Sequence, residues 1–402
     1  MFDYKNADIK FKITSKSVVE SNQILRKFYD ELSKSFKMGW CYQFAKKEKV
    51  IFVGTSNFGE MWLDYKERGL IDHIYVSTAN EKNHAIVENA LKEARDHHDD
   101  FVTYHVRIKF ITKEISFSSM CRKDIILESS LNEEGDYIST ITFSVRAFGK
   151  SDLEYVITQK MNYLRHLLCA YTNMQFDMLF EVGLIQNITY EENEWSDYDM
   201  DWMDRFYNED REPVDTNLIP DFFDIFRMIL DYDSYEKDIR LLLNSAQEIY
   251  CGKLMTNDIS KDPKYRIPGY VDMADTMMIS ALEALSNIGA GKPERCPECG
   301  NLKFKIRKKV EELCIKYLPE FLAMEISKKA YGRRSAFLHE GNARTNEFYC
   351  GRCVPLIDPD TKNTMLYASA FSDINLFEYT TYLFRQVVHD FLCASDESTS
   401  VT

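Results

Sequence analysis

The spacing of the apolar residues changes about halfway along the chain. Near the N-terminus, Ile9, Phe11 and Ile13 alternate with polar residues, and the alternation returns at 104–110 and 141–145. A period of two is typical of half-buried strands. From Pro220 onward, apolar residues recur every three or four positions, which indicates amphipathic helices. The pattern predicts an α+β region at 1–190 followed by an all-α helical bundle at 218–394.

Two local signals refine the N-terminal region. The segment Asn132-Glu133-Glu134-Gly135 precedes an alternating segment and fits the turn of a hairpin. The segment Ser151-Asp152-Leu153-Glu154 has the form of a capping box, which predicts that a helix begins there.

An acidic and aromatic segment separates the two regions. Residues 191–215 hold eleven acidic and two basic residues, with Trp195 and Trp202 among them. We expect 191–217 to be a linker or a long exposed loop, because runs of like charge are usually solvated. A sharper alternative is that the segment mimics nucleic acid and covers a basic surface of the same chain. The polar residues 395–402 are expected to form a disordered tail.

The charge of the chain is unevenly distributed. Its 402 residues carry a net charge of −14, which makes the whole a poor generic binder of nucleic acid. Lys292 to Arg344 nevertheless holds thirteen basic and seven acidic residues. This basic block is either a solvated helix face or a surface for phosphate groups. The chain has no apolar run of 18 residues and begins without a secretory signal, so we expect a cytoplasmic protein that does not span a membrane.

Four of the ten cysteines form two C-x-x-C pairs, Cys296 with Cys299 and Cys350 with Cys353. Four thiolates can close a tetrahedral zinc site, and such a site has no open position for catalysis. We therefore expect structural zinc and no catalytic metal. The alternatives are two unrelated pairs or redox cysteines. A zinc site here would hold both ends of the basic block together.

Arg334 and His339 form an R-x4-H motif between the two cysteine pairs. A histidine titrates near neutral pH and can transfer protons, while a guanidinium stays charged and pairs with phosphate oxygens. Together they suit cleavage of RNA, which carries its own nucleophile in the 2′-OH. Five residues of helix place the two side chains about 140° apart. Either the helix stops between them, or the site is assembled across a symmetric interface. Arg385 and His389 form a similar R-x3-H pattern that we expect to be a surface pair.

The C-terminal half resembles the HEPN superfamily, most closely its Apea-like branch, over about 218–394. The resemblance rests on helix pairs leading into 280–285, on Arg333-Arg334, and on Leu338-His339-Glu340-Gly341. It implies a helical bundle that dimerises, with metal-independent ribonuclease activity in many members and a role in bacterial antiviral defence.

The sequence and the resemblance together define the expected function. It is an RNA endonuclease, an inducible toxin that leaves 2′,3′-cyclic phosphate and 5′-OH ends, with tRNA as the favoured substrate. Arg334 and His339 are the expected catalytic residues, with Glu283, Arg333 and Asn342 in support. Glu283 either faces solvent or orients the histidine or arginine, and Asn342 either touches substrate or caps the helix. Residues 1–190 would sense an unknown trigger, such as a phage protein, or restrain activity. The alternative is a catalytically idle HEPN module that binds a protein or nucleotide partner.

Overall fold

The computed structural model describes most of the chain. The described residues are 4–37, 41–66, 70–112, 115–186, 188–191, 214–216, 219–231, 236–261, 270–291, 294–295, 302–303, 305–341 and 376–399. Sheets occupy the N-terminal half and helices the C-terminal half, so the predicted mixture of α+β and helical parts is confirmed at that level. No helix in these ranges combines the length and the apolar character needed to cross a membrane.

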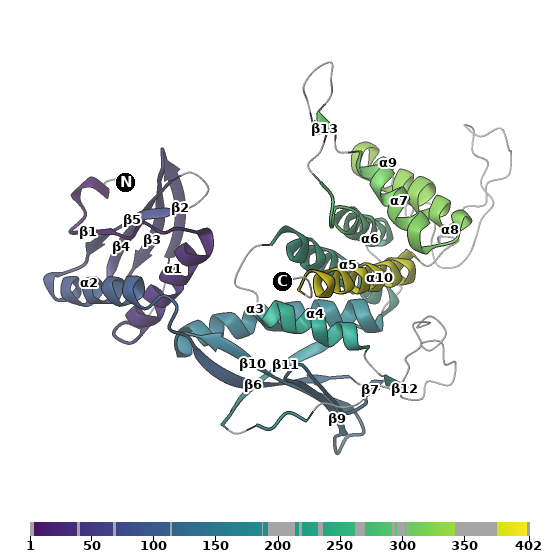
Figure 1. Cartoon of the computed structure of the whole chain (residues 1–402), viewed down its shortest axis with the longest axis horizontal. Coiled ribbons are helices and arrows are strands. Elements are labelled where there is room, and N and C mark those ends of the chain that lie inside the picture. Colours follow the sequence, from purple (N-terminus) through teal and green to yellow (C-terminus); the bar gives the residue numbers. More distant parts are fainter. Residues whose placement is uncertain are drawn as a thin grey trace.

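The first unit is an antiparallel five-stranded sheet with two helices. Its strands run in the order β1-β5-β4-β3-β2. The helices α1 (Val18–Ser33) and α2 (Glu81–Asp96) share one apolar core with the sheet, built around Phe28, Ile74 and Leu91. Figure 1 shows this unit set apart from the remaining chain. Its strands are β1 (Ile9–Lys12), β2 (Cys41–Lys47), β3 (Val50–Ser56), β4 (Gly59–Tyr65) and β5 (Ile71–Thr78), preceded by a 3-10 turn at Tyr4–Asn6.

A second antiparallel sheet has the strand order β11-β6-β10-β9-β8. The predicted hairpin joins β9 to β10, where Gly135 adopts a φ of 86° and the Asn132 N–H donates to the Asp136 carbonyl at 2.9 Å. The strands are β6 (Val102–Ile111), β8 (Met120–Arg122), β9 (Ile125–Leu131), β10 (Tyr137–Ala147) and β11 (Asp177–Ile185). A short parallel pair, β7 (Ile115–Phe117) with β12 (Val214–Thr216), lies beside this sheet.

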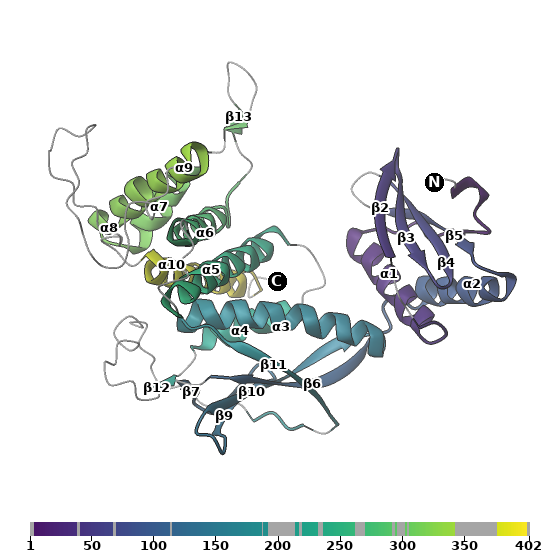
Figure 2. The ribbon, with the colours of Figure 1, turned by 180° about the vertical axis from the view of Figure 1, so that it is seen from behind.

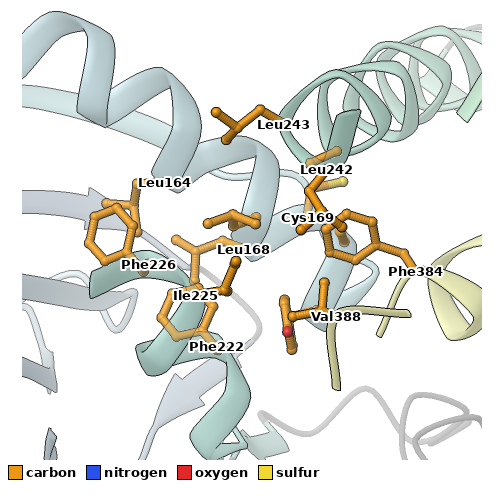
Figure 3. Packing of buried hydrophobic residues seen from close by; sticks show 14 of the residues in the cluster. Leu164, Leu168, Cys169, Phe222, Ile225, Phe226, Leu242, Leu243, Phe384 and Val388 are labelled. Carbon is orange, nitrogen blue, oxygen red and sulfur yellow. The ribbon is translucent and has the colours of Figure 1, made fainter. Parts of the chain in front are cut away.

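The second sheet and the C-terminal helices share one hydrophobic core. Figure 3 shows Leu168 on α3, Phe222 on α4, Leu242 on α5 and Phe384 on α10 converging on the same space. This core crosses the predicted boundary at residue 190, because the apolar face of this sheet is covered by α3 and α4 together. The helices are α3 (Lys150–Thr172), α4 (Pro220–Asp231), α5 (Lys237–Lys261), α6 (Tyr270–Leu285) and α10 (Leu376–Thr399).

A smaller helical layer covers α6. Figure 2 shows α7 and α9 stacked beyond α6, on the side away from the sheets. The chain passes from α7 (Ile306–Tyr317) across Pro319 into α8 (Glu320–Met324), a π-helical segment η4 (Glu325–Ala330) and α9 (Tyr331–Glu340). The break expected at Pro319 is present, since this residue is the N-cap of α8. A short antiparallel pair with two residues in each strand, β13 (Glu294–Arg295) and β14 (Leu302–Lys303), precedes α7.

Two predicted element ends differ from the structure. Helix α3 begins at Lys150 with Gly149 as its N-cap, so the capping box at 151–154 does not form. Asp152, in the first turn, accepts from the Phe148 N–H just before the helix and from Arg26. Helix α10 continues to Thr399, so the residues expected as a tail from 395 onward are helical as far as that position.

A part-buried ion pair joins the two units. The Arg26 guanidinium of α1 donates to both carboxylate oxygens of Asp152 on α3, at 2.8 and 2.9 Å. It also lies over the rings of Phe101 and Phe148, at 5.8 and 5.6 Å from their centroids. The pair therefore fixes α1 against the start of α3.

Candidate functional site

The R-x4-H motif lies on one uninterrupted helix. Both Arg334 and His339 belong to α9, which follows the π-helical segment η4 without a break. The helix ends where expected, at Gly341, whose φ of 67° places it in the left-handed region that glycine adopts without strain. The first alternative for bringing the two residues together, a helix that stops between them, is therefore wrong.

Glu283 on α6 holds Arg334 in place. Arg334 Nη2 donates to Glu283 Oε2 at 3.3 Å, and the Tyr331 hydroxyl donates to Glu283 Oε1 at 2.8 Å. The Arg334 guanidinium also lies 5.8 Å from the centroid of the Tyr331 ring. The expected contact between Glu283 and the arginine is thus present, and we call Glu283, Tyr331 and Arg334 the α6–α9 cluster.

Tyr331 was not anticipated as a member of the site. It stands three residues before Arg334, which is the spacing of neighbours on one helix face, and this signal could have identified it. Burial, the hydrogen bond to Glu283 and the charge of Glu283 raise the pKa of Tyr331, while Arg334 and Arg307 oppose them. The phenol therefore stays a hydrogen-bond donor at neutral pH.

Basic side chains gather around the cluster. Arg307 of α7 is close enough to act electrostatically on Tyr331. Lys309 donates to the Asn287 side chain at 2.8 Å, and that amide donates to the Glu283 carbonyl at 2.7 Å. Residues 305–341 carry nine basic and five acidic side chains. Arg307 and Lys309 of the basic block therefore act on or near the α6–α9 cluster.

His339 lies apart from Arg334 within one chain. The His339 side chain is exposed, whereas that of Arg334 is 20% exposed and turned towards α6. The rotation of a regular helix separates the two residues by about 140°. A single chain therefore offers an anchored guanidinium and a solvent-facing imidazole on different sides of α9.

The remaining predicted site residues divide into two groups. Arg333 is partly buried on α9 beside Arg334. Asn342 and the four cysteines of the zinc prediction lie outside the described residues. The hairpin β13–β14 comes directly before and after the segment 296–301, which carries the first C-x-x-C pair.

A different group of ligand atoms occurs in the first unit. Asp64, Asp72 and His73 offer oxygen and nitrogen atoms within 4.8 Å of one another, the one such group among the described residues. Asp72 already contacts the Lys66 ammonium at 3.2 Å, and Asp64 accepts from the Tyr75 hydroxyl at 2.8 Å. Both carboxylates therefore already have partners within the protein.

The second arginine–histidine pattern is not a surface pair. Arg385 is 1% exposed and donates to the Ala170 carbonyl of α3 at 3.0 Å. Burial lowers its pKa to about 10. His389, one turn further along α10, meets Asp221 of α4 at 2.8 Å. The prediction failed because α3 and α4 both pack on the face of α10 that carries these two residues.

Comparison with known proteins adds no relative. No protein-family model matches the chain, and neither the curated proteins nor the solved structures contain a match.

Proposed function

We propose that this protein is a metal-independent RNA endonuclease of HEPN type, with Arg334 and His339 as its catalytic residues. The observation that carries the proposal is the anchoring of Arg334 by Glu283 and Tyr331 within the basic block of the sequence. Attack of a 2′-OH on the adjacent phosphorus develops negative charge on the phosphate oxygens. A guanidinium held in a fixed direction stabilises that charge without reorganising.

His339 supplies the proton transfer in this proposal. Its exposed position leaves it accessible to a substrate and also to a second copy of the chain. In a symmetric dimer, His339 of one copy meets Arg334 of the other, which removes the constraint of about 140° within one helix. The products are a 2′,3′-cyclic phosphate and a 5′-OH, and tRNA is the proposed substrate.

The first experiment incubates the purified full-length protein with total cellular RNA in EDTA. We expect discrete fragments with 5′-OH ends, and their loss in His339→Ala and in Arg334→Ala. The matched controls are His97→Ala and Arg95→Ala, which remove exposed residues at the end of α2 and should leave cleavage unchanged. Equal cleavage by His339→Ala and the native protein would exclude this mechanism.

Mixing the two inactive variants tests the shared site. Equal amounts of His339→Ala and Arg334→Ala form mixed dimers with one complete site each, which should restore about a quarter of native activity. A mixture that stays inactive after subunit exchange would show that each site lies within one chain.

We also propose that the four cysteines bind one structural zinc ion. The short hairpin β13–β14, which brackets the first pair, is the local support. Metal analysis should give about one zinc per chain, reduced in Cys296→Ser. A folded protein without zinc would refute this part of the proposal.

The first unit is proposed to sense the trigger or restrain the nuclease in antiviral defence. It has its own core, and its contacts with the rest include the Arg26–Asp152 pair and Lys27 over the Phe148 ring. The measurement is the RNA cleavage rate of residues 101–402 against that of the full chain. A higher rate in the fragment supports restraint, and an equal rate argues against it.

One observation favours a second function. The carboxylate of Glu283 already satisfies the charge of Arg334, as it would in a binding module where the arginine is structural. In that case Arg334→Ala would lower the thermal stability of the protein. Incubation with RNA would give no cleavage that either Arg334→Ala or His339→Ala removes.

A further inference from the structure

Three chemically complementary side chains meet where α10 packs on α4. His389 Nδ1 lies 2.8 Å from Asp221 Oδ2, and His389 Nε2 lies 3.7 Å from Cys393 Sγ. His389 and Cys393 are four residues apart on α10, so they occupy one helix face. Asp221 belongs to the first turn of α4 and is 8% exposed.

The two contacts indicate which nitrogen of the neutral His389 ring carries the hydrogen. A carboxylate accepts hydrogen bonds, so His389 Nδ1 carries the hydrogen and donates it to Asp221. His389 Nε2 is then the acceptor, and it faces the thiol. The two contacts use opposite nitrogens of the ring, so the imidazole relays between its neighbours. It does not chelate with them, and these three residues do not form a group of converging ligand atoms among the described residues.

Cys393 differs from the other cysteines with described side chains. Burial raises the pKa values of the Cys169 and Cys314 thiols to about 12, and Cys121 is buried as well. Cys251 is half-buried, and burial raises the pKa of its thiol. Cys393 is exposed and has a proton acceptor beside its sulfur. Exposure and an adjacent base are the two conditions for a reactive thiol.

We propose that Cys393 is a redox-reactive thiol, activated by His389 and Asp221 and oxidised by hydroperoxides to a sulfenic acid. The Cys393 sulfur attacks one oxygen of hydrogen peroxide and an S–O bond forms while the O–O bond breaks. The thiol proton passes to His389 Nε2 and then to the departing hydroxide, which leaves as water. The sulfur is oxidised by two electrons and the peroxide is reduced by two, and a thiol reductant reverses the change. This proposal does not depend on ribonuclease activity.

The test treats the full-length reduced protein with hydrogen peroxide at neutral pH and traps sulfenic acid with dimedone. Mass spectrometry of the peptide that contains Cys393 gives the labelling rate. We expect His389→Ala to slow labelling about tenfold and Asp221→Asn about threefold. The matched control is Asp390→Asn, which removes a neighbouring carboxylate that accepts hydrogen bonds from Lys316 and Tyr317 and acts on His389 through its charge alone. It should change the rate less than twofold.

His389→Gln separates proton transfer from packing. Its amide can still donate to Asp221, but it cannot take the thiol proton, so it should be as slow as His389→Ala while melting at the native temperature. Labelling of Cys393 in His389→Gln at the native rate would overturn the proposal, and so would a native rate no faster than that of free cysteine in the same solution.

Discussion

At the scale of single residues, the α6–α9 cluster shows how one carboxylate sets the direction of a cation. Glu283 accepts from Tyr331 through one oxygen and from Arg334 through the other. The phenol therefore keeps the carboxylate from rotating, and the carboxylate keeps the guanidinium in one place. Networks of this kind are worth more than their separate bonds, because each partner limits the motion of the next.

Removal of the Tyr331 hydroxyl should loosen this arrangement. We expect Tyr331→Phe to lower the free energy of unfolding by about 1 kcal/mol, because it deletes one part-buried hydrogen bond to a charged acceptor. Chemical denaturation measures the stability. An unchanged midpoint would mean that water replaces the hydroxyl without cost.

A half-buried histidine should make the fold sensitive to acid. Burial, and secondly the charge of Arg165, lowers the pKa of His166 from 6.5 to about 4. A histidine whose pKa is depressed in the folded state binds its proton more readily when unfolded. Its stabilising contribution is complete above pH 6.5 and is lost as the pH falls towards 4.

The size of this effect is measurable. Between pH 7 and pH 5 the loss should be on the order of 1–2 kcal/mol. We expect His166→Gln to show a shallower decline of unfolding free energy over this range. Parallel curves for the native protein and the variant would show that other groups cause the acid sensitivity.

At the scale of elements, the closest helix packing depends on a glycine. Gly252 of α5 faces α6, and a Cβ atom there would lie 2.1 Å from the Met278 Cε and 3.3 Å from the Ala274 carbonyl oxygen. The methionine end can move aside, but the backbone carbonyl cannot. Gly252 thus allows α5 and α6 to lie close together at this position. The spacing of apolar residues alone does not predict this close approach.

Two substitutions at Gly252 should separate these constraints. Gly252→Ala should stay within about 1 kcal/mol of the native stability, since the gain in helix propensity offsets the displaced methionine. Gly252→Val should cost about 3 kcal/mol, because its branches meet the carbonyl. Denaturation curves of both variants give the comparison, and equal stabilities would refute the packing argument.

The sequence predicted the elements better than their assembly. Alternation located β6 and β10, and the three-to-four spacing located α4, α5 and α10. The core shared across residue 190 was not foreseen, because a strand pattern does not say which helices cover its apolar face. Arg385 failed for the same reason, since its burial comes from α3, more than 200 residues earlier. The contact of Arg334 with Glu283 was anticipated, but the tyrosine that completes it was not.

At the scale of the whole molecule, the division between units falls near residue 100. Residues 4–96 have their own core, whereas the second sheet and α3 to α10 share another. Residues 216–402 alone would expose the face of α4 that packs on Phe143. A separable helical domain would have left that face polar.

Two fragments should therefore behave differently. Residues 101–402 should show a cooperative thermal transition, destabilised by about 1 kcal/mol because Asp152 exchanges its ion pair with Arg26 for water. Residues 216–402 should bind a hydrophobic dye and melt without cooperativity. Calorimetry of both fragments decides the matter, and cooperative melting of 216–402 would restore the boundary at residue 190.

The π-helical segment η4 sets the rotation of α9 about its own axis. Glu325–Ala330 sits directly between α8 and α9, in a run of chain with no other interruption. A π-helical turn amounts to one residue inserted into a regular helix. Deleting one residue there would keep the helix but turn α9 about its axis by about 100°. Arg334 and Tyr331 would then both turn away from Glu283. The π-helical turn therefore sets the rotation of α9 that brings these two side chains to Glu283.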